Sequence, residues 1–209
     1  VEIINNFVID AKRVLVFKPS FSEYESRARA NSKEVKELFY QEDFTIDIDK
    51  IASVLEKEDL LILGNPNNPT GAVYSEKQLK EIINIAGEYN LPLISDEIYD
   101  QLTYEKKFIS TAALTNDVPV IGLNGFSKVY QMTGWRLGYM YFKGHNGELE
   151  ELRESIEKQC RIRLCANTPV QKAGAAALDG PQDHIKGYVE KLKQRRDYAY
   201  KRLNEIEGV

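Results

Sequence analysis

The feature that most constrains the fold is an alternation of short apolar runs with segments of helical periodicity. Each run is almost continuously apolar, which is typical of a strand buried on both faces. Repeated strand–helix–strand units favour a parallel sheet covered by helices on both sides. The runs are Val14–Phe17, Leu60–Leu63, Leu91–Ile94, Val118–Leu123 and Leu137–Phe142. The sequence therefore predicts an α/β three-layer sandwich with a mainly parallel central sheet, followed by helices.

One predicted helix is marked at both of its ends. Ser75 and Gln78 have the spacing of a capping box, in which two side chains satisfy backbone N–H groups of the first turn. Asn90 and Pro92 are expected to end this helix. Its apolar face repeats at helical spacing through Leu79, Ile82, Ile83 and Ala86.

The last third of the chain is predicted to be helical throughout. Apolar stripes, Thr-Pro starts and glycine stops define three helices there. The first carries Leu149, Leu152 and Ile156; the second begins at Thr168–Pro169 with Gln171 and ends at Gly180; the third runs from Ile185 to Ile206 and stops at Gly208. The stretch from Val1 to Val8 also resembles the middle of a helix.

Composition excludes several kinds of partner. The chain has 209 residues, 43% of them hydrophobic, and a net charge of −4, so one globular domain without a nucleic-acid partner is expected. No apolar run is long enough for a bilayer, and no basic-then-apolar leader follows Val1, so no membrane partner is expected. Two cysteines, Cys160 and Cys165, suit a reducing cytoplasm. His145 and His184 lie far apart without an acidic pattern, so no metal site is expected.

A lysine and an arginine stand in an unusual arrangement of glycines. Lys128 ends the run 124–128, Asn-Gly-Phe-Ser-Lys, and Arg136 lies between Gly134 and Gly138. A lysine amine can form a Schiff base with a carbonyl, and a guanidinium can grip two phosphate oxygens. Taken alone, Lys128 is better interpreted as a solvated loop lysine and Arg136 as a surface arginine. Together they indicate a cofactor that carries both an aldehyde and a phosphate.

Two further motifs follow predicted strands. The segment 65–71, Asn-Pro-Asn-Asn-Pro-Thr-Gly, comes after the Leu60–Leu63 run and is more constrained than an ordinary turn requires. The segment 95–99, Ser-Asp-Glu-Ile-Tyr, comes after the Leu91–Ile94 run. Open α/β sheets bind ligands at the carboxyl ends of their strands. Asp96 and Tyr99 are therefore placed at such an edge, although a helix-start aspartate with a packed tyrosine is equally compatible.

Other enzyme classes lack their motifs in this chain. There is no phosphate-binding loop ending in Gly-Lys-Ser or Gly-Lys-Thr, no G-x-G-x-x-G and no G-x-S-x-G. A basic cluster, Lys191, Lys193, Arg195 and Arg196, is interspersed with acidic residues, so a solvated helix face is expected there.

The three motifs, in this order, resemble the fold type I pyridoxal phosphate-dependent aminotransferases. The resemblance covers nearly the whole chain and rests on Asn-Pro-x-Asn-Pro-Thr-Gly, Asp-Glu-x-Tyr and Ser-Lys-x₅-Gly-x-Arg-x-Gly. The segments 124–130 and 163–169 are most similar to those of archaeal and bacterial alanine aminotransferases. The resemblance implies a cytoplasmic homodimer that acts on an amino acid and a 2-oxo acid in amino-acid biosynthesis.

The resemblance also implies a role for each site residue. Lys128 would form the Schiff base and shuttle the substrate proton, and Asp96 would pair with the pyridine nitrogen. Asn68 and Tyr99 would hydrogen-bond the phenolic oxygen, Arg136 would bind the phosphate, and Ser127 would complete the cofactor-binding set. Phe21 falls where the family stacks an aromatic ring on the cofactor, although a core phenylalanine after the Val14–Phe17 strand is the alternative.

The chain departs from the family pattern in three places. Gly125 stands where many relatives have a serine that binds the phosphate. The family's phosphate-cradling turn precedes the position of Val1, and its substrate-binding arginine lies in a small C-terminal domain beyond Val209. We therefore expect residues 1–209 to be an incomplete cofactor-binding large domain that is inactive alone as a transaminase.

The predicted reaction of the intact protein is transfer of an amino group between alanine and 2-oxoglutarate. Three alternatives share the same lysine or the same fold. One is an aminotransferase for aspartate or aromatic substrates, another is a carbon–sulfur lyase, and the third is a non-catalytic cofactor-binding module.

Overall fold

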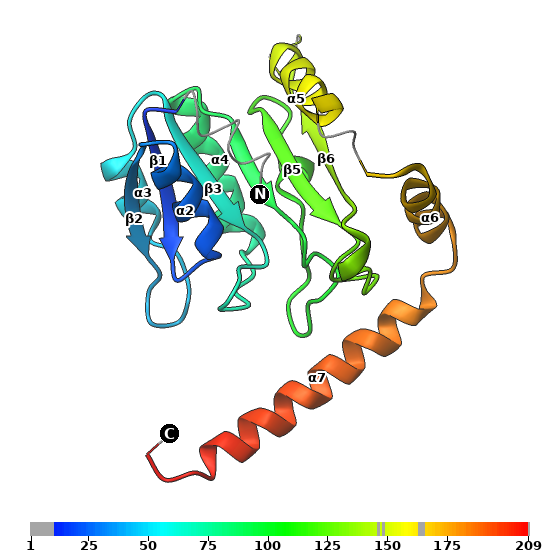
Figure 1. The fold of residues 1–209 in the computed structure, drawn as a ribbon. Coiled ribbons are helices and arrows are strands. Elements are labelled where there is room, and N and C mark those ends of the chain that lie inside the picture. The colour runs from blue at the N-terminus through cyan, green and yellow to red at the C-terminus, as the bar shows by residue number, and fades with distance from the viewer. Residues whose placement is uncertain (1–10, 146, 148, 163–165, 209) are drawn as a thin grey trace.

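The computed structural model describes residues 11–145, 147, 149–162 and 166–208 (Figure 1). The helix expected from Val1 to Val8, the Arg163–Cys165 part of the alanine-type segment, and Cys165 itself lie outside the described residues.

The centre of the fold is a six-stranded sheet with the order β2-β1-β3-β4-β5-β6. The five strands from β2 to β5 in this order pair in parallel, and β6 pairs antiparallel to β5 at one edge. This confirms the α/β class and the mainly parallel sheet. The strands are β1 Arg13–Lys18, β2 Glu34–Phe39, β3 Asp59–Gly64, β4 Leu93–Asp96, β5 Val120–Gly125 and β6 Gly138–Lys143.

Two predicted strand starts were wrong by two residues, and one strand was missed. The runs expected from Leu91 and Val118 become strands only at Leu93 and Val120. Pro92 and Pro119 precede those residues, and proline has no N–H for a strand ladder. The missed strand, β2, lies at the other edge of the sheet, where only Leu38 is buried and charged residues interrupt the apolar ones, so there is no apolar run to detect.

Helices cover both faces of the sheet, which gives the expected three layers (Figure 1). On one face, α2 (Ser22–Ala30) and α5 (Glu150–Ile162) pack over Val14, Ile62 and Ile121. On the other, α3 (Ile48–Val54) and α4 (Glu76–Glu88) pack over the alternate residues of the same strands, such as Leu15, Leu61 and Leu93. Two short 3₁₀ turns, η1 (Thr111–Leu114) and η2 (Thr133–Trp135), flank β5.

The ends of α4 follow the sequence. Both hydrogen bonds of the capping box between Ser75 and Gln78 are present, which stabilises the helix by roughly 1 kcal/mol. The helix ends at Glu88, and Asn90 then takes a left-handed conformation with φ of 54°. The predicted apolar face is buried as expected: Leu79, Ile82, Ile83 and Ala86.

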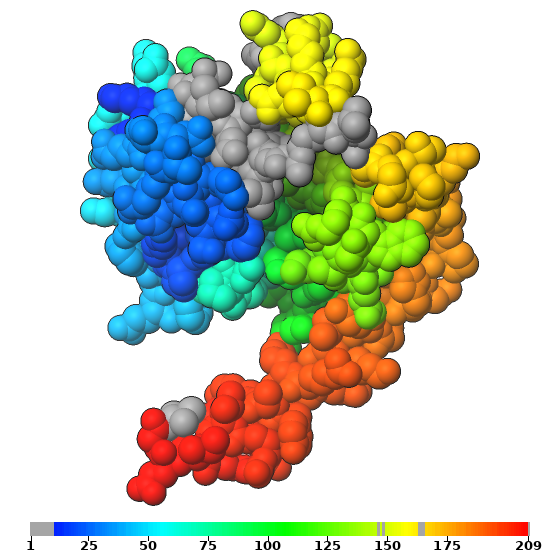
Figure 2. All heavy atoms as spheres, viewed as in Figure 1, coloured from blue at the N-terminus to red at the C-terminus, as the bar shows by residue number. Residues whose placement is uncertain are grey.

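The C-terminal helices form a separate arm. In α6 (Thr168–Asp179), the cap is Asn167 rather than Thr168, because the Asn167 side chain accepts from the Val170 N–H, and Gly180 ends the helix as expected. The long α7 (Asp183–Asn204) begins against the body at the buried Ile185 and then leads away from the sheet (Figures 1 and 2). None of the described helices is both long enough and apolar enough to cross a membrane.

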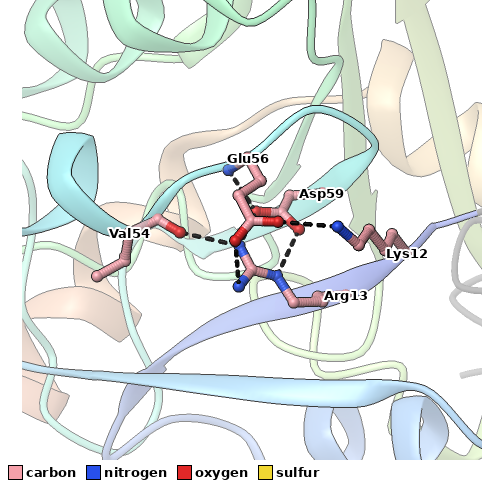
Figure 3. Close-up of polar contacts among 5 residues, drawn as sticks. All are labelled: Lys12, Arg13, Val54, Glu56 and Asp59. Atoms are coloured by element: carbon pink, nitrogen blue, oxygen red, sulfur yellow. Dashed lines mark hydrogen bonds and ion pairs between the residues drawn. The ribbon is translucent and has the colours of Figure 1, made fainter.

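A buried ion cluster joins the starting ends of β1 and β3 (Figure 3). The Arg13 guanidinium donates to both oxygens of Asp59, at 2.9 and 2.7 Å, and to the Val54 carbonyl at 2.9 Å. Glu56 lies 3.1 Å from Arg13 and accepts from Lys12 at 2.9 Å, on the exposed side of the cluster. The cluster therefore fixes the end of the sheet opposite the carboxyl ends of the parallel strands.

Candidate active site

A cavity of about 460 Å³ opens at the carboxyl ends of β3, β4 and β5. This is the edge at which open α/β sheets bind ligands. Every residue that the sequence suggested for the site lines this one cavity: Phe21, Asn68, Asp96, Tyr99, Ser127, Lys128 and Arg136. The segments that carry them lie far apart in sequence, and the parallel sheet brings them together.

Asp96 is the last residue of β4, and its carboxylate is held from two sides. The Tyr24 hydroxyl donates to Oδ2 at 2.7 Å, and the Ile98 N–H donates to Oδ1 at 3.3 Å. Burial raises the pKa of the Asp96 carboxyl above its ordinary value, while the hydrogen bond from Tyr24 and the charge of Lys128 lower it. Tyr24 therefore offsets part of the cost of keeping this carboxylate charged away from water.

Lys128 stands in the loop that follows β5. Its Nζ lies 5.3 Å from the centre of the Tyr99 ring, in a cation–π arrangement. Two hydrogen bonds fold the loop back on itself. The Met132 N–H donates to the Phe126 carbonyl at 3.1 Å, and the Thr133 side-chain hydroxyl donates to the Ser127 carbonyl at 3.1 Å. The amine is thus presented beside Tyr99 by a closed loop.

Arg136 has a left-handed backbone, with φ of 52° at the end of η2. One of its guanidinium nitrogens donates to the Thr133 carbonyl at 2.9 Å, and the side chain is otherwise exposed at the mouth of the cavity. The remaining N–H groups of a guanidinium suit an anionic oxygen.

The glycine that departs from the family pattern has a structural explanation. A Cβ on Gly125 would lie 3.0 Å from the Gly138 Cα and 3.1 Å from the Leu137 carbonyl oxygen. Both neighbours are backbone and cannot move as a flexible side chain would. The close approach of β5 and β6 at the cavity therefore excludes a serine at position 125 unless the backbone shifts.

In the Asn-Pro loop after β3, two asparagines hold the loop in place and a third lines the cavity. Asn65 is buried; its side chain donates to the Ile109 carbonyl and accepts from the Tyr74 N–H, both at 3.3 Å. Asn67 donates to the Pro19 carbonyl at 3.0 Å and to the Thr70 hydroxyl at 2.8 Å. These two side chains hold the loop, which leaves Asn68 as the asparagine that lines the cavity.

The position of Phe21 confirms that it packs against the core and leaves its role beside a cofactor a prediction. It is half-buried and lines the cavity, and it also packs against the core on the α2 face. Its ring meets Tyr24 edge-to-face, with centroids 5.6 Å apart and planes at 83°. The ring is therefore held by Tyr24, the residue whose hydroxyl donates to Asp96.

Sequence reasoning missed two groups beside the site. Tyr24 lies in the first turn of α2, three residues after Phe21 at its N-cap, and that spacing is the only signal for its position. Glu97 lies on the opposite face of the sheet, 3% exposed. It accepts hydrogen bonds from the hydroxyls of Ser95 and Ser110, each at 3.0 Å, and of Tyr141 at 2.8 Å, and from the Thr111 N–H at 3.1 Å. This buried network anchors the end of β4 behind Asp96.

In the part of the chain that the structure describes, no group of three or more His, Cys, Asp or Glu side chains could hold a metal ion. His145 and His184 are both exposed.

The described fold and site can be compared with known proteins. A family model described as aminotransferase class I and II matches residues 3–209. A protein from Methanocaldococcus jannaschii named "Probable aspartate aminotransferase" is 38% identical over 195 residues, which cover 92% of this chain and 52% of that protein. Glutamate-pyruvate aminotransferase AlaA of Escherichia coli K12 is 38% identical over 172 residues, 80% of this chain and 42% of that protein.

A solved structure of an alanine aminotransferase from Pyrococcus furiosus superimposes with a TM-score of 0.92 at 49% sequence identity. The superposition covers 99% of this chain and 54% of that one. The chain thus spans about half the length of the relatives that it matches. Because the family model extends over almost all of the sequence, the chain belongs to the class I and II aminotransferases.

Proposed function

We propose that the protein is a pyridoxal phosphate-dependent transaminase that transfers the amino group of alanine to 2-oxoglutarate. The observation that carries this proposal is the shared cavity of Lys128, Asp96, Asn68, Tyr99 and Arg136. An amine, a carboxylate, two hydrogen-bonding groups and a guanidinium are the chemical complement of an aldehyde, a ring nitrogen, a phenolic oxygen and a phosphate.

The class I and II aminotransferases depend on pyridoxal phosphate, and the cavity fits this cofactor. When bound, it supplies an aldehyde that joins the substrate amine and a ring that withdraws electrons from the substrate Cα. Asp96 would hold the proton on the ring nitrogen, with Tyr24 holding Asp96. Asn68 and Tyr99 would bind the phenolic oxygen, Arg136 and Ser127 the phosphate, and Phe21 a face of the ring.

Lys128 has two tasks in this assignment. Its Nζ would hold the cofactor aldehyde, and as a free amine it would move a proton between the substrate Cα and the cofactor carbon that carried the aldehyde. Both tasks require an amine that is held in place and reaches the cavity. The Tyr99 ring, 5.3 Å from Nζ, and the closed loop after β5 support that placement.

The substrate assignment draws on the names of the relatives. Those from E. coli and P. furiosus are named for glutamate–pyruvate and alanine transamination, which supports alanine. The M. jannaschii relative is named for aspartate, so aspartate is the second candidate substrate. Assays of the intact protein with alanine, aspartate and an aromatic amino acid, each with 2-oxoglutarate, would separate these assignments.

The cofactor assignment has a direct test. The chain is incubated with pyridoxal phosphate, reduced with borohydride and digested, and the labelled peptides are mapped by mass spectrometry. We expect a label on Lys128 that disappears in Lys128→Ala and persists in Lys107→Ala, an exposed lysine outside the cavity. A main label on any other lysine would overturn the assignment.

We also propose that the intact protein is a homodimer. Trp135 and Tyr139 support this, because they are 52% and 42% exposed and lie at or next to the rim of the cavity. Exposed aromatic side chains are frequent at interfaces. Sedimentation of the intact protein would give twice the monomer mass, and a monomer at micromolar concentration would contradict the proposal.

A further inference from the structure

A side-chain hydrogen bond crosses between the two segments that carry the proposed chemistry. Asp100 follows Tyr99 after β4, and Asn124 precedes the Lys128 loop on β5. The Asn124 amide donates from Nδ2 to Oδ2 of Asp100 at 3.0 Å. Both side chains are half-buried, and neither has a role in the proposed chemistry.

Each of the two side chains also accepts a hydrogen bond from the backbone N–H of the residue that follows it. Oδ1 of Asp100 accepts from the Gln101 N–H at 2.7 Å, and Oδ1 of Asn124 accepts from the Gly125 N–H at 2.7 Å. Three hydrogen bonds thus run in series from the turn after Tyr99 to the start of the Lys128 loop. A side chain fixed at both ends transmits its position to the backbone better than one that is free at one end.

The pair lies where the strand ladder has ended. The register of β4 and β5 runs to Asp96 and Leu123, and one more backbone bond joins the Glu97 N–H to the Leu123 carbonyl at 2.8 Å. Beyond that bond, the Asp100–Asn124 contact joins the two segments again, next to the position where Lys128 Nζ stands over the Tyr99 ring. Burial raises the pKa of Asp100, whereas the hydrogen bond from Asn124 lowers it and so favours the charged acceptor.

We propose that Asp100 and Asn124 are positioning residues that set the spacing between Tyr99 and Lys128 in the cavity. The proposal rests on the proposed function, since it assumes that Lys128 is the amine that captures the cofactor aldehyde. It predicts that the two side chains act as one unit. What matters is that a hydrogen bond joins positions 100 and 124, whichever of the two side chains donates it.

The test exchanges the two side chains. In Asp100→Asn, the single amide oxygen can accept from the Gln101 N–H or from the Asn124 amide but not from both, and its NH₂ then faces the other donor. Asn124→Asp places two carboxylates opposite each other. Each single variant therefore breaks the series of hydrogen bonds. The double variant Asp100→Asn/Asn124→Asp restores it with donor and acceptor reversed. In the double variant, the new amide still accepts from the Gln101 N–H and the new carboxylate still accepts from the Gly125 N–H.

The measurement is borohydride-trapped labelling of Lys128 at limiting pyridoxal phosphate, relative to labelling of the exposed Lys107. We expect each single variant to lower this ratio about tenfold, the size of one lost charge-assisted hydrogen bond. The double variant should return to within about twofold of the wild type. Asp179→Asn removes an exposed carboxylate at the end of α6 and serves as the matched control, with no expected change.

A second readout needs no cofactor. Hydrogen exchange at the Gly125 and Gln101 amides should be faster in both single variants and return to the wild-type rate in the double variant. Additive losses in the double variant, or exchange rates restored without the Lys128 label, would overturn the positioning role. If the wild type itself shows no label on Lys128, the proposed function fails and this inference fails with it. If the wild type is labelled on Lys128 but the double variant does not regain that label, the positioning role is contradicted and the proposed function still stands.

Discussion

At the scale of single residues, the position of the Asp96 carboxylate depends on Tyr24, a residue that is distant from it in the sequence. Tyr24 lies on α2, and its hydroxyl reaches across the face of the sheet to the end of β4. Asp96 could be predicted because an aspartate at a strand end follows from the local pattern. The contact between Tyr24 and Asp96 could not be predicted, because it depends on how α2 crosses β1 and β3, and the sequence pattern does not give that packing.

Replacing Tyr24 with Phe should destabilise the chain in a pH-dependent way. Burial raises the pKa of Asp96, so stability falls as the pH rises through that pKa, where the folded chain must ionise a carboxyl that the unfolded chain ionises more easily. Loss of the Tyr24 hydroxyl raises the pKa of Asp96 further, so this fall continues to higher pH and becomes larger in total. We expect Tyr24→Phe to cost about 1–3 kcal/mol at neutral pH and much less at acidic pH, where Asp96 is protonated in both proteins.

Urea unfolding of both proteins across this pH range measures the difference. Phe21→Leu is the matched control, because it changes the ring that packs edge-to-face on Tyr24 without removing the hydroxyl. Its effect should be the same at every pH. An effect of Tyr24→Phe that is equally independent of pH would show that Tyr24 acts through packing alone.

At the scale of elements, the two ends of the sheet differ in what holds them. The carboxyl ends form the cavity, and the opposite end of β1 and β3 is held by Arg13 and Asp59, which are directly paired in register. The side chains of Arg13 and Asp59 are 11% and 0% exposed. Removing one partner of such a pair leaves the other charge buried without compensation.

We therefore expect Asp59→Ala to lower the free energy of unfolding by about 3–5 kcal/mol. The exposed ion pair of the same cluster offers a control: Lys12→Ala removes the contact with Glu56 on the solvent side and should leave the unfolding midpoint nearly unchanged. Urea denaturation followed by far-UV circular dichroism compares the two variants. Equal effects would mean that the buried pair contributes no more than the exposed one.

The junction of β5 and β6 requires a glycine. The Tyr141 ring lies across Gly122, where a Cβ would stand 1.9 Å from the ring carbon Cζ. Hydrogen bonds to Glu97 and Ser110 hold the Tyr141 hydroxyl, so the ring cannot move aside without breaking them.

Gly122→Ala should therefore destabilise the chain by about 1–3 kcal/mol through overpacking. Gly187→Ala is the matched control, because nothing lies within 4 Å of the Cβ position of Gly187 inside α7. There the methyl group should stabilise the chain by about 0.5–1 kcal/mol through helix propensity. Thermal unfolding should thus shift in opposite directions, and two shifts of the same sign would contradict the packing argument.

The elements that could be predicted are those with a strong local signal. The apolar runs placed β1, β3, β4, β5 and β6 to within two residues, and capping residues placed α4. The edge strand β2 and the short helices α2 and α3 gave no such signal, since charged residues interrupt the apolar ones in β2 and α2, and α3 is only 7 residues long. The motif residues of the site gather in one cavity because strand ends of a parallel sheet share an edge. The side chains that hold those residues contact them over long sequence distances and were not predictable.

At the scale of the whole molecule, α7 is attached to the body through few contacts. The basic cluster on this helix was expected to be a solvated face, and Arg196 is indeed exposed, but its side chain also contacts the body. Its guanidinium donates to both oxygens of Glu105 at 2.9 and 2.6 Å and lies 4.7 Å from the centre of the Tyr104 ring. Beyond Arg196, the described side chains of α7 are exposed, and the helix leaves the body (Figure 2). Arg196 thus joins α7 to the loop that follows Tyr99 in the candidate site.

Replacing Arg196 with Ala should loosen α7 and this loop together. We expect faster amide hydrogen exchange in residues 188–200 and 103–106, and unchanged exchange in β3 at the centre of the sheet. Arg195→Ala is the matched control, because Arg195 makes no ion pair among the described residues. Because the Arg196–Glu105 pair is exposed to solvent, about 1 M salt should screen it and reduce the difference between Arg196→Ala and the wild type. A difference that salt leaves intact would assign the attachment to stacking of Arg196 on Tyr104. Faster exchange in α7 alone would show that the helix and the loop move independently, so that α7 has no hold on the segment beside Tyr99.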